Sequence, residues 1–192
     1  KIEIDILKNP IGKQDQYIAT YGGFKKFIFN EDGSVDIHNF NFDKDKLLKI
    51  GSNMLLHFTD QTRNANKILK KQTKNIGDKF EDLKKIASLV EDLEAGLMAN
   101  NFDTIGDLLK VNWEIKRTLS SGITTPQIDN MVNLAMDNCA KGCKISGAGG
   151  GGFLFAYVDR NLQNKYRKAM EGFRELPFMI EPLGSRIIFN IS

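Results

Sequence analysis

Residues 144–158 read KISGAGGGGFLFAYV, and the rest of the sequence is interpreted outward from this stretch. Glycine fills five of the six positions from Gly147 to Gly152, directly before an apolar segment of strand length, Phe153 to Val158. Glycines in this place indicate a turn through positive φ, or the close approach of another group to the backbone. We therefore expect a buried strand over 153–158 and a candidate site at the glycines before it.

Two familiar glycine motifs do not fit this context. Gly147, Gly149 and Gly152 match G-x-G-x-x-G, but the dinucleotide fingerprint needs a strand before the glycines and a helix after them. Here a strand-like segment follows the glycines. A P-loop fails as well, because no Gly-Lys-Ser/Thr closes the run, and Gly12-Lys13 is followed by Gln14. The remaining alternative to a site is a tight turn between two core segments.

Composition narrows the class of protein. The chain has 192 residues, of which 41% are hydrophobic, enough for one sizeable core or two small ones, and one domain is the default expectation. The 27 basic and 24 acidic residues are interspersed, which argues against nucleic-acid binding and is compatible with a phosphorylated small molecule. Cys139 and Cys143 have no neighbouring histidine, so we expect reduced thiols and no metal site. With no membrane-spanning stretch and no signal-peptide pattern, we expect no membrane partner and a cytoplasmic protein.

Periodicity along the chain predicts an α+β fold, in which helices cover a largely antiparallel sheet. The turn at Asp32-Gly33 predicts a hairpin. The expected strands are 26–29, 35–38, 53–59, 153–158, 177–180 and 186–191. The expected helices are 44–49, a region from 63 to 137 interrupted near 74–77, 100–101 and 120–122, and 162–173.

Asp15 is the best candidate for catalysis, because it lies between Gln14 and Gln16 and could act as a base whose charge is held by neighbouring donors. The alternative is a solvated aspartate. Arg63 follows a buried strand and opens a helix, where a guanidinium and backbone N–H groups can bind a phosphate; the alternative is a surface arginine. The two histidines, His38 and His57, have no suggestive partner and are expected to be structural.

Three segments share a resemblance to one family. The run 144–152 resembles the third motif of the GHMP small-molecule kinases, and residues 10–17 resemble the segment that holds the catalytic aspartate in the sugar kinases of that superfamily. With Thr62-Arg63, residues 113–116 and residues 123–124, the sequence most resembles the heptose 7-phosphate kinases.

The resemblance implies a GHMP kinase C-terminal domain with a ferredoxin-like core over 43–192. Residues 1–42 would then be a remnant of the N-terminal lobe, a helix with Asp15 and a hairpin. It also implies phosphoryl transfer from ATP, with Mg²⁺, to the anomeric hydroxyl of a phosphorylated heptose. Asp15 would be the catalytic base. The residues implied to bind substrate are Lys13, Gln14, Thr62 and Arg63, and the implied phosphate and substrate loop is Ser146, Gly147, Ala148, Gly149, Gly150, Gly151 and Gly152.

The sequence departs from the family in one respect. No segment matches the Pro-x-x-x-Gly-Leu-x-Ser-Ser phosphate loop of the family. The one Ser-Ser pair, Ser120-Ser121, is not preceded by a glycine-rich segment. We therefore expect a fragment that is inactive alone, whose partner is an N-terminal half carrying the main ATP and Mg²⁺ residues, and which can form a homo-oligomer. Two alternatives stay open: a GHMP kinase for another substrate, such as galactose, fucose or a mevalonate-pathway compound, and a non-catalytic metabolite-binding module.

Overall fold

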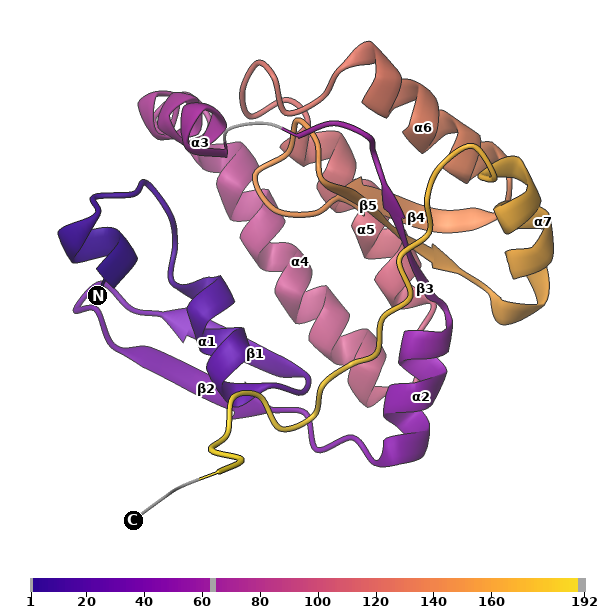
Figure 1. Cartoon of the computed structure of the whole chain (residues 1–192). Helices are drawn as coiled ribbons and strands as arrows, with labels where there is room; N and C mark the ends of the chain where they lie inside the picture. Colours follow the sequence, from indigo (N-terminus) through magenta and orange to yellow (C-terminus); the bar gives the residue numbers. More distant parts are fainter. Residues whose placement is uncertain (1, 63–64, 190–192) are drawn as a thin grey trace. The chain divides into compact units, whose positions relative to one another are not determined.

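The computed structural model describes residues 2–62 and 65–189, which fall into two compact units. The first, called the larger unit below, comprises the described residues up to Pro10 and Ser52–Phe178. The second, the smaller unit, comprises Ile11–Gly51 and the described residues from Met179 onward. Each unit is described separately (Figure 1).

A three-stranded antiparallel sheet forms the centre of the larger unit. Its strands are β3 (Met54–Phe58), β4 (Ala140–Ile145) and β5 (Phe153–Val158), in the order β3-β5-β4. The predicted strand over 153–158 is therefore confirmed, and it lies in the middle of the sheet. Its apolar residues suit this position, because a central strand is covered on both faces. Together with the helices, this sheet confirms the predicted α+β class.

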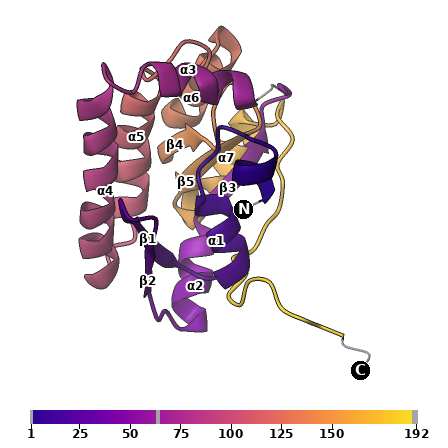
Figure 2. The ribbon, with the colours of Figure 1, turned by 90° about the vertical axis from the view of Figure 1, so that its left-hand side faces the viewer.

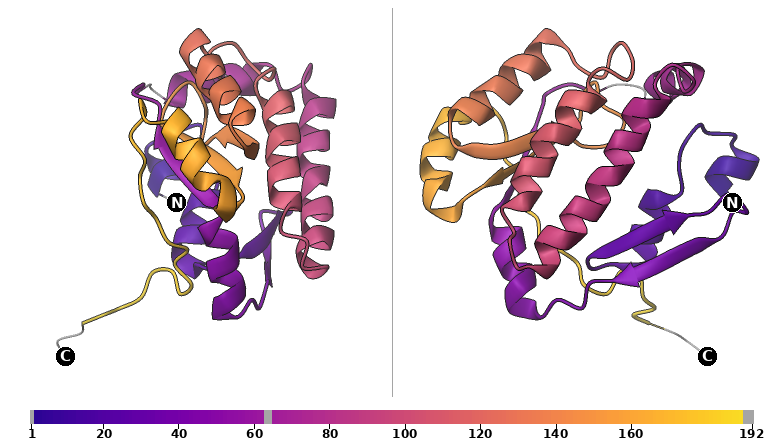
Figure 3. Two further views of the ribbon diagram at one scale, coloured as in Figure 1. Left: turned by 90° about the vertical axis from the view of Figure 1, so that its right-hand side faces the viewer. Right: turned by 180° about the vertical axis from the view of Figure 1, so that it is seen from behind.

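Helices cover both faces of this sheet. Cys143 of β4 places its Sγ 4.0 Å from the carbonyl oxygen of Val132 in α6 (Pro126–Asp137), whereas the neighbouring Gly142 abuts Gly106 of α5 (Thr104–Lys116). Because successive strand residues point to opposite faces, α5 and α6 lie on opposite sides of the sheet (Figure 3). The long helices α4 and α5 run side by side (Figure 2). The helices of the larger unit are α3 (Ala65–Lys74), α4 (Phe80–Met98), α5 (Thr104–Lys116), α6 (Pro126–Asp137) and α7 (Gln163–Ala169), with a π-helical turn at Ile2–Ile6 and a 3₁₀ turn at Arg160–Leu162.

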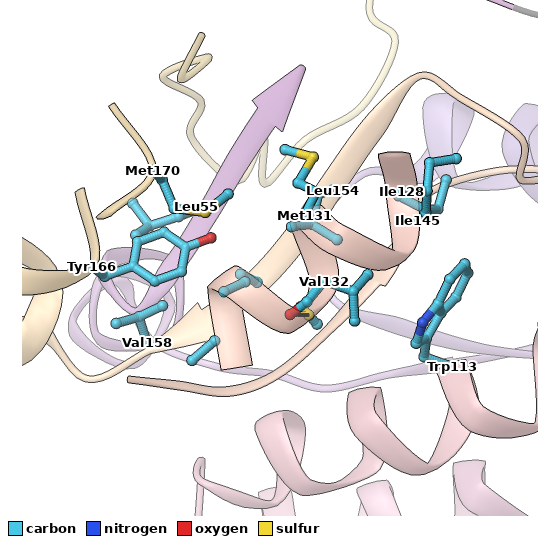
Figure 4. Packing of buried hydrophobic residues seen from close by; sticks show 14 of the residues in the cluster. Leu55, Trp113, Ile128, Met131, Val132, Ile145, Leu154, Val158, Tyr166 and Met170 are labelled. Atoms are coloured by element: carbon cyan, nitrogen blue, oxygen red, sulfur yellow. Dashed lines mark hydrogen bonds between the residues drawn. The ribbon is translucent and has the colours of Figure 1, made fainter. Parts of the chain in front are cut away.

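The hydrophobic core of the larger unit lies between the sheet and these helices (Figure 4). Leu154 of β5 and Trp113 of α5 are both at most 1% exposed. The other labelled core residues are Leu55, Ile128, Met131, Val132, Ile145, Val158, Tyr166 and Met170. The apolar spacing of three and four residues in the sequence is thus explained by core packing.

The smaller unit contains the predicted hairpin and two helices. Strands β1 (Lys25–Phe29) and β2 (Val35–Asn39) pair antiparallel around the turn at Asp32-Gly33. Helix α1 (Gln14–Tyr21) packs on the hairpin through Tyr17, whose ring lies 5.8 Å from that of Phe27 and 5.9 Å from that of Phe29. Helix α2 (Lys44–Ser52) follows the hairpin and is longer than the predicted 44–49.

Two predictions for the C-terminal part are wrong. No strand forms over 177–180 or over 186–189, and residues 190–191 lie outside the described residues. The segment that pairs with β3 is 174–176 instead: Phe58 N–H donates to the Arg174 carbonyl at 2.8 Å, and Leu176 N–H donates to the Leu56 carbonyl at 2.8 Å. The edge of β3 is therefore paired with residues that precede the predicted strand over 177–180. Helix α7 also ends at Ala169, earlier than the predicted 173.

Candidate functional site

The glycine run forms the loop between β4 and β5. The loop closes where Ser146 N–H donates to the Phe153 carbonyl at 2.9 Å. Its backbone has positive φ at Gly147, Gly149, Gly150, Gly151 and Gly152, with values from 72° to 151°. Residues with a side chain rarely adopt a positive φ, which explains why the segment is built from glycine.

Two other segments of the larger unit hold the far end of the glycine loop. Gly150 N–H donates to the Ile123 carbonyl at 2.7 Å, and Gly152 N–H donates to the Gln61 carbonyl at 2.9 Å. Thr59 donates to the Gly152 carbonyl from its N–H, at 2.9 Å, and from its hydroxyl, at 3.0 Å. The backbones approach so closely that a Cβ added to Gly151 would lie 2.5 Å from the Gln61 oxygen.

We call the segments that hold the far end of the loop, residues 59–61 and Ile123, the clamp. A network of side chains links the clamp to the start of α6. The Gln61 amide donates to Gln127 Oε1 at 2.6 Å and accepts from the Thr125 hydroxyl at 3.2 Å, and Gln127 Nε2 donates to the Thr59 carbonyl at 3.3 Å. Thr125 is the N-cap of α6, because its hydroxyl accepts from Ile128 N–H at 3.2 Å. The geometry of the loop is therefore coupled to an adjacent helix end.

Several backbone donors of the loop have no acceptor in the part of the chain that the structure describes. Among the described residues, no acceptor is bonded to the N–H groups of Gly147, Ala148, Gly149 and Gly151. Successive backbone N–H groups with no partner in the protein are suited to an anion, such as a phosphate group. The loop can therefore act as an anion-binding segment.

Lys116, at the end of α5, is a site residue that sequence reasoning missed. Its Nζ donates to the Ile145 carbonyl at 3.2 Å and to the Gly147 carbonyl. Burial, with a smaller effect from the nearby Lys144, lowers the pKa of Lys116 to about 8. Burial also lowers the pKa of Lys144, which lies in β4. One signal was available: Lys116 follows the apolar Trp113 by three positions, so both lie on one face of the helix.

The predicted residues Lys13, Gln14 and Asp15 lie together at the start of α1, in the smaller unit. All three are exposed, and the Lys13 Nζ donates to the Gly33 carbonyl at 3.3 Å. Asp15 is in the first helical turn, where the helix dipole favours a carboxylate. In the larger unit, Thr62 is exposed and follows the clamp residue Gln61 directly. Arg63 lies outside the described residues.

The other titratable residues give no metal centre in the part of the chain that the structure describes. No group of three or more His, Cys, Asp or Glu side chains there could hold a metal ion. Cys139 and Cys143 are both free thiols, and burial raises the pKa of Cys143 to about 12. His57 is buried, with its Nε2 3.8 Å from a carboxylate oxygen of Glu175. Among the described helices, none has the length and apolarity needed to cross a membrane.

The fold and loop define an α+β domain whose antiparallel sheet carries a glycine-rich loop between two neighbouring strands. Residues 89–173 match the family model described as GHMP kinases C terminal. This part of the chain is a GHMP kinase C-terminal domain, which confirms the resemblance inferred from the sequence.

The chain is similar to several kinases of small molecules. The chain is 30% identical over 162 residues to D-glycero-alpha-D-manno-heptose 7-phosphate kinase of Campylobacter jejuni, covering 83% of this chain and 48% of the relative. It is 30% identical over 142 residues to the mevalonate kinase of Saccharolobus solfataricus, covering 74% and 42%. A crystal structure of a Campylobacter jejuni protein described as a candidate sugar kinase matches with a TM-score of 0.67 and 26% identity, over 95% of this chain and 53% of that one. The chain spans about half the length of these relatives.

Proposed function

We propose that this chain is the C-terminal portion of an ATP-dependent sugar kinase that phosphorylates the anomeric hydroxyl of heptose 7-phosphate. The observation that carries the proposal is the 30% identity over 162 residues to a heptose 7-phosphate kinase. The clamped glycine loop adds a physical argument, because its unused N–H groups suit a phosphate-bearing ligand. Phosphoryl transfer depends chiefly on positioning and charge stabilisation, which a rigid loop can provide.

In this proposal each predicted site residue has a role. Asp15 accepts the proton of the sugar hydroxyl, or orients that hydroxyl, as phosphoryl transfer proceeds. Lys13 and Gln14 contact the sugar next to Asp15. Thr62 and Arg63 bind the phosphate that the sugar already carries, because a guanidinium matches phosphate geometry. The loop from Ser146 to Gly152 shapes the substrate site.

ATP and Mg²⁺ are the proposed cofactors, and the residues around the loop fit a phosphate group. Besides the unused N–H groups, Lys116 and Lys144 place two cationic side chains beside the loop, and no carboxylate in the described residues lies within 4.0 Å of either amine. The nucleotide supplies the phosphoryl group, and Mg²⁺ neutralises phosphate charge. We assign the main binding residues of both to an N-terminal half, of which residues 1–42 are the last part, with the C-terminal domain over 43–192. A cytoplasmic location and formation of a homo-oligomer belong to the same proposal.

Mevalonate is the second candidate substrate, because a mevalonate kinase matches at the same 30% identity, over 142 residues. It differs from a heptose phosphate in having a carboxylate and no phosphate. A site built for a substrate phosphate would therefore favour the heptose. Arg63 does not by itself separate the two substrates, because a guanidinium pairs with a carboxylate as well as with a phosphate.

The experiment is an ATP-dependent phosphorylation assay on the protein that joins this chain to its N-terminal half, with heptose 7-phosphate, unphosphorylated heptose and mevalonate compared. We expect turnover on heptose 7-phosphate, an anomeric phosphate as product by ³¹P NMR, and weak or no turnover on the other two. This chain alone should give little or no turnover. Preference for mevalonate would replace the heptose proposal, and no phosphorylation of any of the three would contradict a kinase with these substrates.

A further inference from the structure

The first residue of the glycine loop, Gly147, has fewer anchors than the residues after it, because Ala148 packs against the core and Gly149 abuts Ile123. Backbone hydrogen bonds fix Gly150 and Gly152, but a Cβ added to Gly147 would meet no heavy atom within 4 Å. Packing therefore does not hold Gly147. Among the described residues, the polar contacts to 147–149 come from one side chain, that of Lys116.

Lys116 joins two points of the chain that flank the turn into the loop. Its Nζ donates to the carbonyl oxygen of Ile145, the last residue of β4, at 3.2 Å, and to the carbonyl oxygen of Gly147, the first glycine. Hydrogen bonds from a charged donor are roughly twice as strong as neutral ones. The partly buried site also limits competition from water.

We propose that Lys116 is a positioning residue of the glycine loop: by joining the carbonyl oxygens of Ile145 and Gly147, its ammonium fixes the start of the loop in the conformation seen here. This inference goes beyond the proposed function, because it assigns a role to a residue outside the predicted site. Its test measures the loop directly and needs no phosphoryl transfer, so the two proposals can fail independently.

The charges around Lys116 make its contribution depend on pH. Burial and Lys144 of β4 bring the pKa of Lys116 down to about 8. The other charged groups nearby are engaged with each other: Arg117 contacts Asp129 of α6 at 2.9 Å and Glu114 of α5 at 3.9 Å. Deprotonation of Lys116 above its pKa would remove the charge that strengthens both hydrogen bonds, and so loosen the start of the loop.

Other groups on the elements packed against α5 change this expectation little. On α4, Lys79 pairs with Asp82 at 3.2 Å. On β4 and β5, burial raises the pKa values of Cys143 and Tyr157, so both stay neutral around pH 8. Burial lowers the pKa of Lys144 as it does that of Lys116, so both amines lose their charge as the pH rises. A variant of residue 116 that keeps its charge is needed to separate the effect of Lys116 from that of Lys144.

The test is amide hydrogen exchange of this chain by NMR, with rates expressed as protection factors to remove the intrinsic effect of pH. The reporter is Ser146, whose N–H donates to the Phe153 carbonyl at 2.9 Å and belongs to the peptide group whose carbonyl, that of Ile145, accepts from Lys116. The reference is Val158, whose N–H donates to the Asn53 carbonyl at 2.7 Å. Four proteins are compared: wild type, Lys116→Met, Lys116→Arg and, as a matched control, Lys110→Met, which changes an exposed lysine of the same helix.

We expect Lys116→Met to lower loop protection by about ten- to hundredfold while Val158 keeps its protection, since hydrogen bonds of a charged donor are lost. Lys110→Met should match the wild type. Wild-type loop protection should fall as pH passes about 8, and Lys116→Arg should restore protection without that fall, because a guanidinium stays protonated.

Unchanged loop protection in Lys116→Met would overturn the inference, and so would an equal loss at Val158, which would indicate general destabilisation. If the loop protection of Lys116→Arg falls with pH as it does in the wild type, the pH effect comes from Lys144 and the pH part of the inference is wrong. If Lys116→Met does not fold, the wild-type series decides: loop protection that is constant from pH 7 to 9.5 overturns the inference.

Discussion

The glycine loop and Asp15 stand in contrasting surroundings. In the larger unit the loop joins two strands of a sheet whose helices enclose a core that includes Trp113, Leu154 and Tyr166. In the smaller unit Asp15 is exposed in the first turn of α1, and among that unit's described hydrophobic side chains only Ile50 is fully buried. A two-stranded hairpin with two short helices has little apolar surface to bury.

The contrast shows two ways of positioning the candidate site residues. The loop owes its geometry to tertiary structure, because residues 59–61 and Ile123 must be in place before Gly150 and Gly152 can form their hydrogen bonds. Asp15 owes its placement to local structure, the helix start and the ring contacts of Tyr17. We therefore expect Gly150 and Gly152 to stay fixed until the larger unit unfolds, and the Asp15 segment to be less stable than this end of the loop.

The largest stability effect should come from the core of the larger unit. Leu154→Ala should lower the free energy of unfolding by about 2–5 kcal/mol, because it empties a site that is fully buried. Ile28→Ala, at a position that is 38% exposed in β1, should cost less than about 1 kcal/mol. Urea unfolding measures both costs when two signals are followed: the fluorescence of Trp113, the single tryptophan, for the larger unit, and circular dichroism for the whole chain. Equal costs would contradict the difference between the units.

Gly151 offers a second comparison, at the loop. Gly151→Ala should lower the free energy of unfolding by about 1–3 kcal/mol, because the new Cβ would lie 2.5 Å from the Gln61 carbonyl oxygen, a backbone atom that cannot easily move away. The matched change in the smaller unit is Gly12→Ala, where a Cβ would meet nothing within 4 Å and the change should stay within about 0.5 kcal/mol. Thermal unfolding of both variants measures the difference. A Gly151→Ala protein as stable as the wild type would mean that the loop is not clamped.

The smallest predicted effect concerns the two histidines. Burial lowers the pKa of His57 below its usual 6.5, although Glu175 opposes the shift. The unfolded chain therefore binds a proton at a higher pH than the folded chain, and the free energy of unfolding should fall as pH drops below about 6.5. Arg167 lowers the pKa of Glu175 below 4.5, so the stabilisation from that carboxylate is lost only in more acidic solution.

Variants of the two histidines isolate this effect. Between pH 7 and 5.5, His57→Phe should flatten the dependence of the unfolding free energy on pH. His38→Phe, which changes the exposed histidine of β2, should leave it as in the wild type. A slope that His57→Phe does not alter would mean that the buried imidazole does not titrate in this range.

Most elements with a clear hydrophobic period could be predicted from the sequence. The hairpin, α4, α5, α6 and β5 all lie where apolar spacing or turn residues placed them. Strand β4 could not be recognised, because its sequence, AKGCKI, contains two lysines and a glycine. Tertiary contacts explain two of these residues: Lys141 contacts Asp103 and Asp107 at 3.3 and 3.4 Å, and Gly142 allows α5 to approach the strand.

The C-terminal strands were predicted from apolar residues that the described structure leaves in solvent. Ile187 is 85% exposed and Ile188 is 88% exposed, with no strand beside them to complete a ladder. Apolar pattern alone cannot reveal whether a pairing edge is available. For the site, the glycine loop was predictable, whereas the partners that fix it, Gln61 and Ile123, depend on contacts between segments far apart in the sequence.

The central claim is that Asp15 serves phosphoryl transfer to a sugar phosphate. The direct measurement compares kcat/KM for heptose 7-phosphate in the protein that joins this chain to its N-terminal half, as wild type, Asp15→Asn and Asp45→Asn. Asp45 is the matched control, because it too is exposed in the first turn of a helix of the smaller unit. We predict a loss of about 10²- to 10⁴-fold for Asp15→Asn and nearly full activity for Asp45→Asn. Equal activity of the two variants would contradict the account.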